Sequence, residues 1–344
     1  MKTIVASVDN ILDKEINYKQ AVDILKNGEV VAFPTETVYG LGAVATNKTA
    51  VEKIFKAKGR PSDNPLIVHI GTQQEVAYYA ANVPETAVAL MDGFWPGPLT
   101  LVFELIPGVI APNVTPDVST VGIRMPNHPI ALELLRALKM PLAAPSANRS
   151  GKPSPTEAIH VKNDLDGCIP LILDGGQTGV GLESTVIDMT TVPPVILRPG
   201  GITRAMIEKI IGPVEVASDS VLEETPRAPG MKYTHYAPDA PLIIIEANRA
   251  AMEQAVQELH EKNKRVAIVG PNELNIPTAN WYFAIGSHQN KEEMATNLYK
   301  ALRQCDQTKA DVILAVEMDL SGVGIAFMNR LEKAADGKRY KPLS

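Results

Sequence analysis

Four basic side chains stand where a strand or a helix is expected to give way to a loop. Lys58 and Arg60 flank Gly59 in the segment FKAKGRPSDNP, and Arg124 and Arg198 each end an apolar run, TVGIR and VILR. Arginine offers a planar fork that suits phosphate or carboxylate, and lysine offers a point charge. Because Lys58 and Arg60 are expected to lie past the end of the preceding helix, its dipole does not account for them. We therefore favour anion binding over a solvated surface for this pair.

Three loops near these groups are rich in uncharged donors and acceptors. They are PTETVYGLG, PLAAPSANRSGKPSPT and LESTVID, and their hydroxyl and amide side chains belong to Thr35, Thr37, Ser146, Asn148, Ser150, Ser154, Ser184 and Thr185. Each loop alone reads as a plain polar loop, but together such groups can line a polyphosphate or a ribose. After VILR, the pair Gly200-Gly201 leads to a helix with Thr203 as its expected N-cap, a geometry that suits an anion.

No side chain stands out as a covalent catalyst. His69, in the apolar run LIVHI, is by itself more typical of a hydrogen-bonded core residue than of a catalyst. The six histidines show no HExxH spacing, and the chain has no GxSxG elbow, no Walker A loop and no GxGxxG. Basic groups without a nucleophile suit phosphoryl or nucleotidyl transfer, which depends mainly on positioning and charge neutralisation.

The composition predicts a soluble, cytoplasmic protein with two domains. Its 344 residues are 45% hydrophobic and 21% charged, enough for a sizeable core. The net charge of −6 argues against a broad electrostatic grip on nucleic acid. Cys168 and Cys305 lie far apart, so they indicate neither a disulfide framework nor a zinc site. We expect no membrane partner, because no segment reaches the roughly 18 to 20 apolar residues that span a bilayer.

Strand-like and helix-like runs alternate along the chain, which indicates an α/β fold. The larger part is expected to hold a mixed sheet, with helices such as 47–58 and 128–139 among strands at 29–34, 65–70, 98–105, 119–126, 169–176, 184–189 and 194–201. The last hundred residues follow a more regular pattern, typical of a small parallel three-layer α/β domain. We place a catalytic domain at residues 1–222, a linker at 223–241 and a C-terminal domain at 242–344.

The linker is unlike a simple tether, which would be Gly/Ser-rich or plainly Pro-rich. Its sequence PRAPGMKYTHYAPDAP sets aromatic and basic side chains between prolines. We interpret it as a lid across the mouth of the active site, with Tyr236, and in a further version His235, reaching the bound nucleotide. Such a lid would exclude water from labile intermediates. The alternative is that the aromatic side chains pack on the domain interface.

Seven motifs in one order resemble the threonylcarbamoyl-AMP synthase family, the YrdC-like proteins. They are PTETVYGLG, KAKGRPSDNPLIVHI, FWPGPLTLVF, STVGIRMPNHP, PLAAPSANRSGKPSPT, ESTVIDM and ILRPGGIT. The tail after residue 240 and the sequence PGMKYTHYAP are similar to the longer, two-domain branch of that family. The resemblance implies a YrdC-like twisted mixed sheet with helices, followed by a smaller Rossmann-like domain.

The resemblance also implies a reaction and its residues. L-threonine, bicarbonate and ATP, with Mg²⁺, would give threonylcarbamoyl-AMP and pyrophosphate, the first step of the threonylcarbamoyladenosine (t6A) modification of tRNA. Lys58 and Arg60 would act on the phosphates. The threonine-binding positions would be Thr35, Thr37, His69, Arg124, Ala144 and Ser184. The ATP-binding positions would be Arg60, Asn64, Thr120, Ser146, Asn148, Ser154, Arg198 and Tyr236. Downstream threonylcarbamoyl-transferring proteins are the implied partners, and direct tRNA binding would be weak.

Two other functions remain open at this point. A carbamoyltransferase of the hydrogenase-maturation type also handles an adenylate, but those chains resemble larger proteins with cysteine-rich zinc motifs that two isolated cysteines cannot supply. A non-enzymatic RNA-binding module would need a basic, aromatic-rich face, which the acidic composition does not favour.

Overall fold

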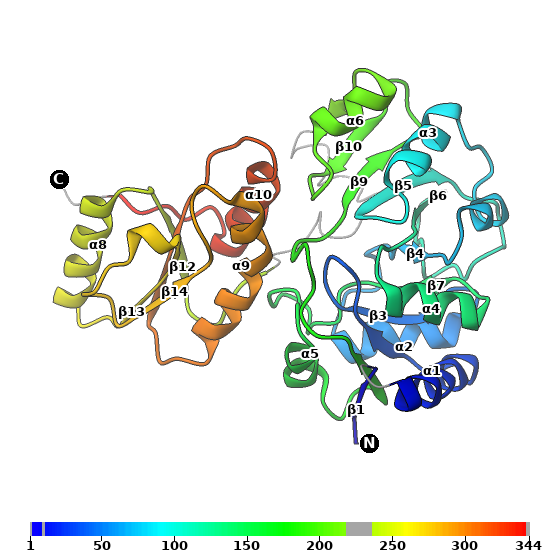
Figure 1. Cartoon of the computed structure of the whole chain (residues 1–344), viewed down its shortest axis with the longest axis horizontal. Coiled ribbons are helices and arrows are strands. Elements are labelled where there is room, and N and C mark those ends of the chain that lie inside the picture. Colours follow the sequence, from blue (N-terminus) through cyan, green and yellow to red (C-terminus); the bar gives the residue numbers. More distant parts are fainter. Residues whose placement is uncertain (1, 9–10, 218–235, 342–344) are drawn as a thin grey trace. The chain divides into compact units, whose positions relative to one another are not determined.

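The chain forms two compact units in the computed structural model, which describes residues 2–8, 11–217 and 236–341 (Figure 1). The first unit contains residues 1–150, 155–179 and 183–232, and the second contains residues 151–154, 180–182 and 233–344. The short segments 151–154 and 180–182 thus group with the C-terminal residues. Most of the linker expected at 223–241 lies outside the described residues.

The first unit is built on an 11-stranded mixed sheet with the order β1-β8-β2-β3-β7-β4-β6-β5-β9-β10-β11. The strands are β1 Ile4–Ser7, β2 Val31–Phe33, β3 Gly40–Val44, β4 Val68–His69, β5 Leu99–Glu104, β6 Thr120–Arg124, β7 Leu142–Ala143, β8 Leu171–Asp174, β9 Thr185–Asp188, β10 Val195–Arg198 and β11 Glu215–Val216. The sheet contains both parallel pairs, such as β4 with β6, and antiparallel pairs, such as β4 with β7. The prediction of a mixed sheet is confirmed.

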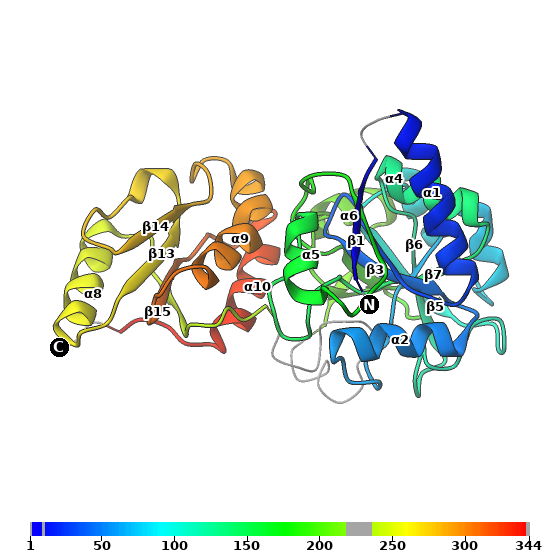
Figure 2. The same cartoon turned by 90° about the horizontal axis from the view of Figure 1, so that it is seen from below.

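Helices cover both faces of this sheet (Figure 2). The helices α1 Ile11–Lys26 and α4 Pro129–Leu138 pack together on one face. The helices α2 Lys48–Lys58, α3 Glu85–Phe94, α5 Ala158–Leu165 and α6 Arg204–Ile211 belong to the core of the other face. Alternation along β2 decides which side chain joins which core: Val31 and Phe33 pack with α1 and α4, and Ala32 faces the opposite way.

The ends of α2 set the position of the basic cluster. The side chain of Asn47 accepts a hydrogen bond from the amide of Ala50, as expected of an N-cap. Gly59 ends the helix in the left-handed conformation, with φ of 62°, and its N–H donates to the helix carbonyls. Lys58 is therefore the last helical residue and is buried, so the expectation that it lies past the helix was wrong. Arg60 does lie past the helix.

The second unit is a small three-layer α/β domain with an all-parallel sheet, as predicted. Its strands β12 Leu242–Ile245, β13 Val266–Gly270, β14 Trp281–Ala284 and β15 Val312–Val316 have the order β12-β15-β13-β14. Helix α8 Arg249–Glu261 covers one face, and α9 Lys291–Asp306 and α10 Gly324–Ala335 cover the other (Figures 1 and 2). Within the described ranges, none of the helices has the length and apolar character that a bilayer crossing requires.

Candidate functional site

Arg124 and His69 lie side by side at the ends of two parallel strands. They are direct partners in the register of β4 and β6, and both side chains are buried. The guanidinium of Arg124 donates through Nε to the carbonyl oxygen of Gly97 at 3.3 Å. A buried arginine has to be paired or ligand-bound, because an unpaired buried charge is costly. These strand ends therefore form the floor of the candidate site.

The turn after β2 brings two threonine hydroxyls together. Oγ1 of Thr35 lies 2.8 Å from Oγ1 of Thr37 and donates to the carbonyl oxygen of Val38 at 2.7 Å. The hydroxyl oxygen of Thr35 also accepts hydrogen bonds from the backbone amides of Thr37 and Val38. Because the hydroxyl of Thr35 is held by hydrogen bonds to the backbone of its own turn, it fixes the position of the Thr37 hydroxyl.

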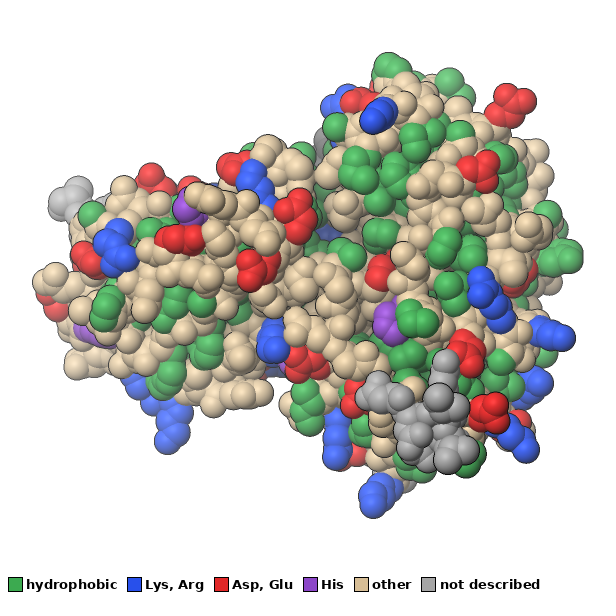
Figure 3. Space-filling view, in the orientation of Figure 1, with side chains coloured by type: hydrophobic (Ala, Val, Ile, Leu, Met, Phe, Trp, Pro, Cys, Tyr) green, Lys and Arg blue, Asp and Glu red, His purple; other side chains and the backbone are tan. Residues whose placement is uncertain are grey.

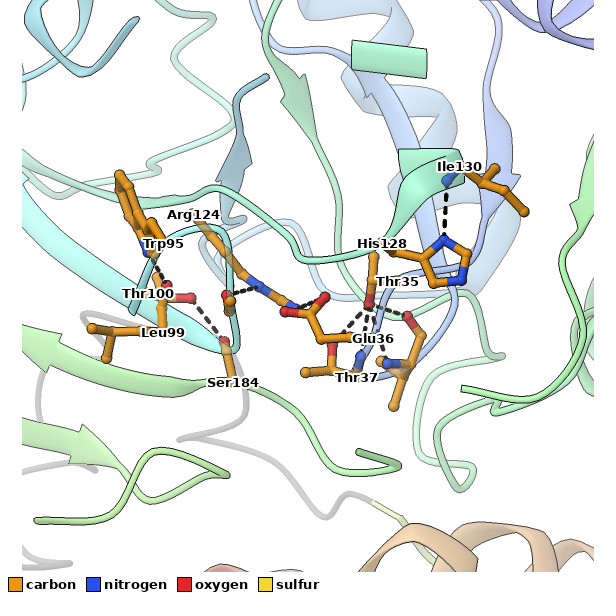
Figure 4. A network of polar contacts seen from close by, with 12 residues as sticks. Thr35, Glu36, Thr37, Trp95, Leu99, Thr100, Arg124, His128, Ile130 and Ser184 are labelled. Carbon is orange, nitrogen blue, oxygen red and sulfur yellow. Dashed lines mark hydrogen bonds and ion pairs between the residues drawn. The ribbon is translucent and has the colours of Figure 1, made fainter. Parts of the chain in front are cut away.

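Glu36, between these threonines, was not among the residues predicted from the sequence. Its Oε2 lies 2.7 Å from Nη2 of Arg124, and the side chains are only 11% and 5% exposed (Figure 4). The ion pair is poorly aligned, since neither carboxylate oxygen of Glu36 nor Nη2 of Arg124 has a hydrogen-bond partner within the described ranges. The available signal was a lone acidic residue in an otherwise uncharged turn after a buried strand.

Ser184, which immediately precedes β9, lies with Thr100 on the side of Arg124 that is opposite to Thr35 and Thr37 in Figure 4. Oγ of Ser184 lies 2.8 Å from Oγ1 of Thr100 and accepts from Nη2 of Arg198 at 3.2 Å. Nε of Arg198 donates to the carbonyl oxygen of Ser184 at 3.1 Å. Gly200 allows this approach, because a Cβ there would lie 2.2 Å from the amide nitrogen of Thr185.

Two histidines near Arg124 are held neutral. Burial, with Arg124 beside it, lowers the pKa of His69 to about 3. Its Nδ1 lies 3.2 Å from the carbonyl oxygen of Ile67, which can only accept, so Nδ1 carries the proton and Nε2 keeps its lone pair. Burial also lowers the pKa of His128, and the negative charge of Glu36 partly offsets this decrease. The Nδ1 of His128 caps α4 by accepting from the amide of Ile130.

Lys58 is bound to the loop after β7. Its Nζ donates to the carbonyl oxygens of Ser146 at 2.6 Å and Asn148 at 2.5 Å, and lies 3.3 Å from Oδ1 of Asn148. Oγ of Ser146 donates to the same Oδ1 at 2.5 Å. The Lys-x-Arg and Ser-x-Asn motifs are therefore one structural cluster, in which the buried ammonium shapes the loop.

The loop after β7 also contacts the segment that follows the two threonines. The amide of Ala147 donates to the carbonyl oxygen of Tyr39, and the amide of Leu41 donates to that of Pro145. Ala144 donates its amide to the carbonyl oxygen of Ile67, two residues before His69. The predicted Ser146 and Asn148 are thus connected through the backbone to the predicted threonine-binding positions.

Three other predicted nucleotide positions are Arg60 and Asn64, which follow α2, and Thr120, which begins β6. Nη2 of Arg60 donates to the carbonyl oxygen of Pro65 at 3.2 Å. The side-chain amide of Asn64 and the hydroxyl of Thr120 are buried without hydrogen bonds in the described part of the chain. Thr120 begins β6 and Arg124 ends it, so these two predicted positions stand at opposite ends of one strand.

Ser154 and Tyr236 belong to the second unit. Ser154 is buried. The Tyr236 ring is stacked on Tyr299, with ring centroids 5.3 Å apart, and the guanidinium of Arg330 lies 5.9 Å from its centroid. Its φ of 69° is unusual for a residue with a side chain and marks a constrained backbone. His235 lies outside the described residues.

In the described part of the chain, the acidic and metal-binding side chains do not gather into a cage. Within residues 2–8, 11–217 and 236–341, no group of three or more His, Cys, Asp or Glu side chains could hold a metal ion. On the face shown in Figure 3, lysine and arginine side chains are scattered among acidic ones and form no continuous basic patch.

A buried arginine and clustered hydroxyls at the strand ends of a mixed sheet define an α/β enzyme that binds a small charged substrate. A family model described as "Telomere recombination" matches residues 23–200, and one described as "Threonylcarbamoyl-AMP synthase, C-terminal domain" matches residues 202–336. The threonylcarbamoyl-AMP synthase of Bacillus subtilis (strain 168) is 49% identical over 332 residues, covering 96% of each chain. The chain belongs to the threonylcarbamoyl-AMP synthase family, whose members form an adenylate.

Two further comparisons extend this likeness across both units. The threonylcarbamoyl-AMP synthase of Pyrococcus abyssi is 47% identical over 342 residues, covering 97% of this chain and 98% of its own. The crystal structure of P. abyssi Sua5 complexed with L-threonine matches with a TM-score of 0.93 and 45% identity, covering 98% of this chain and 99% of that chain.

Proposed function

We propose that the chain joins L-threonine, bicarbonate and ATP into threonylcarbamoyl-AMP with release of pyrophosphate, the first step of the t6A modification of tRNA. The observation that carries this proposal is the buried Arg124 at the hydroxyl-rich strand ends. The likeness to a solved relative complexed with L-threonine supports it. We also place the reaction in the cytoplasm, where tRNA and ATP are available together.

Arg124 is the natural partner of the threonine carboxylate, because its guanidinium fork matches that group. The hydroxyls of Thr37 and Ser184, the Nε2 lone pair of His69 and the backbone at Ala144 then supply the remaining polar contacts. Thr35 supports them by fixing Thr37. A site that pairs the substrate hydroxyl discriminates more strongly than one that only encloses a methyl group.

The nucleotide is assigned to the cluster around Lys58. Arg60 and Arg198 offset charge on the phosphates, and Asn64, Thr120, Ser146, Asn148, Ser154 and Tyr236 complete the set. Because the Lys58 ammonium already donates to loop oxygens, it holds Ser146 and Asn148 in place, and its positive charge adds to the field on the leaving pyrophosphate. Tyr236 belongs to the proposed lid.

The chemistry needs no protein nucleophile. The threonine amine takes up CO₂ to form a carbamate, and a carbamate oxygen then attacks the α-phosphorus as the bond to pyrophosphate breaks. The protein contributes orientation and charge stabilisation. Mg²⁺ would bind together with ATP. Such an ion is held mainly through the substrate phosphates, which agrees with the lack of an acidic cluster among the described residues.

The product has to reach a protein that transfers the threonylcarbamoyl group to tRNA, so such transferases are the proposed partners. The two other functions lose support. Identity to threonylcarbamoyl-AMP synthases over nearly the whole chain disfavours a hydrogenase-maturation carbamoyltransferase. The mixed charges in Figure 3 do not favour an RNA-binding module.

Pyrophosphate release tests the proposal. Purified protein with ATP and Mg²⁺ should release pyrophosphate only when both L-threonine and bicarbonate are present, and omission of either should abolish the signal. Release of ADP and free phosphate instead would exclude adenylyl transfer.

A further inference from the structure

The carboxylate of Glu36 is unusual because it is buried with little support. Its Oε2 lies 2.7 Å from Nη2 of Arg124. Both carboxylate oxygens are shielded from solvent and lack a hydrogen-bond partner within the described residues. A buried carboxylate with one poorly aligned counter-charge is costly unless a further donor completes it. The site therefore calls for a ligand that brings positive N–H donors to Glu36.

A free α-amino acid carries such a group. Its carboxylate and its ammonium are attached to the same carbon, so a substrate whose carboxylate pairs with Arg124 brings its ammonium next to the partner of Arg124. That partner is Glu36 (Figure 4). The Arg124 guanidinium is anchored through Nε on Gly97, which leaves its remaining N–H groups for the incoming carboxylate. Glu36, displaced from Arg124, is then available to the ammonium.

The nearby histidines are poor alternatives as proton acceptors. Among the described residues, three charged or titratable groups lie around Glu36. Arg124 from β6 forms the ion pair with it, His69 from β4 is the strand partner of Arg124, and His128 at the start of α4 interacts electrostatically with Glu36. With the pKa of His69 at about 3, its Nε2 accepts a hydrogen bond but does not hold a proton at neutral pH. The Nδ1 of His128 already accepts the amide of Ile130, and burial lowers its pKa.

We propose that Glu36 takes the proton from the α-ammonium of threonine and so releases the amine for carboxylation. This proposal rests on the proposed function. The N–H electron pair stays on nitrogen as the proton moves to a carboxylate oxygen of Glu36. Glu36 returns the proton to the hydroxyl of bicarbonate, whose C–O bond breaks to give CO₂ and water.

The amine lone pair then forms the N–C bond with CO₂, and one C=O electron pair moves onto oxygen. The remaining surplus proton on nitrogen passes to Glu36 and from there to solvent, which regenerates the carboxylate. In sum, the ammonium form of threonine and bicarbonate give the carbamate, water and a proton, so atoms and charge balance.

The test compares two directions of the reaction in the variant Glu36→Gln, which keeps the volume and an acceptor oxygen for Arg124. The forward assay is pyrophosphate release from ATP, threonine and bicarbonate. The reverse assay is ATP formation from threonylcarbamoyl-AMP and pyrophosphate, in which the carbamate is already made. We expect the forward rate to fall at least about 100-fold, as for loss of a general base, and the reverse rate to be unchanged.

Two controls sharpen the comparison. Glu29→Gln removes an equivalent charge from a partly exposed ion pair with Lys53 at 2.6 Å and should leave both directions unchanged. In an alkaline buffer, where free threonine already carries a neutral amine, the forward deficit of E36Q relative to the wild type should shrink. A deficit that stays constant with pH would contradict a role in deprotonation.

The outcomes are separable. If the wild type makes no ATP in the reverse assay, the proposed function itself fails. If the wild type works in both directions but E36Q is equally slow in both, or normal in both, the role of Glu36 is overturned. A lower KM for threonine with an undiminished forward rate would show that Glu36 only competes for Arg124, which also overturns it.

Should E36Q fail to fold by circular dichroism, Glu36→Asp replaces it. This variant keeps a carboxylate but draws it back by one methylene group. We expect a slower forward rate with an unchanged reverse rate. Equal effects on both directions would contradict the proposal.

Discussion

Nζ of Lys58 lies 2.5 Å from the main-chain carbonyl oxygen of Asn148. This contact joins the last residue of α2 to the loop after β7, and the ammonium also donates to the carbonyl oxygen of Ser146. A buried ammonium with carbonyl partners is stable, because each N–H finds an acceptor. The contact therefore gives Lys58 a positioning role in addition to its charge.

Lys58→Met should destabilise the first unit and weaken nucleotide binding together. Loss of the ammonium removes the donor to a buried carbonyl oxygen of Asn148 and to a partly buried one of Ser146, at up to about 1 to 3 kcal/mol for each. Urea unfolding measures the first effect and ATP titration calorimetry the second. Lys56→Met, at an exposed position of the same helix, is the matched control and should stay within about 0.5 kcal/mol of the wild type. Equal effects of the two substitutions would contradict the positioning role.

Arg124→Ala should weaken threonine binding by about 2 to 5 kcal/mol, because a buried charge partner is lost. Arg60→Ala should mainly weaken ATP binding. Titration calorimetry of each variant with threonine and with ATP measures the two effects separately. Weaker ATP binding in Arg124→Ala together with weaker threonine binding in Arg60→Ala would overturn the assignment.

Arg124→Ala should also lower the free energy of unfolding by about 3 to 5 kcal/mol, since Glu36 is left buried without its counter-charge. The double variant R124A/E36Q should recover part of that loss. Strictly additive losses would show that the two residues do not interact.

The stability of the first unit should fall as the pH drops below about 6.5. The pKa of His69 is lowered to about 3 in the folded state. Between about pH 3 and 6.5 the unfolded chain therefore binds a proton at this histidine that the folded chain does not bind. The contribution of neutral His69 to the free energy of unfolding is complete above the pKa of about 6.5 that histidine has in the unfolded chain. It is lost as the pH falls towards about 3, by up to about 1.4 kcal/mol per pH unit.

His69→Asn should flatten this dependence between neutral pH and about pH 5 in urea unfolding. The asparagine amide can replace the bond from Nδ1 to the carbonyl oxygen of Ile67. His260→Asn, at an exposed position of α8, should leave the dependence unchanged. An unaltered slope in His69→Asn would contradict a buried neutral imidazole.

The lid proposal predicts that Tyr236→Ala, and separately truncation after Leu222, abolish most threonine-dependent pyrophosphate release while the first unit stays folded by circular dichroism. Tyr236→Phe keeps the ring that stacks on Tyr299 but removes the hydroxyl. If that hydroxyl reaches the nucleotide, Tyr236→Phe should lose activity as well. Full activity in the folded, truncated protein would reduce the linker to a tether.

A local signal in the sequence predicted where a helix begins. Thr203 caps α6 as expected, because a cap depends on residues within one turn. The burial of Lys58 was not predictable in this way, since its acceptors come from a distant loop. The same holds for Glu36, whose meaning depends on Arg124 in another strand. Contacts that are distant in sequence carry no local pattern, so these two features required the fold.

The most direct test of the proposed reaction follows the carbon of bicarbonate. The protein is supplied with ATP, Mg²⁺, L-threonine and ¹³C-labelled bicarbonate, and the adenylate product is analysed at once by mass spectrometry. The account predicts one product that contains AMP, threonine and the labelled carbon, formed together with pyrophosphate. A threonyl adenylate without the label, or no adenylate at all in the presence of all three substrates, would contradict it.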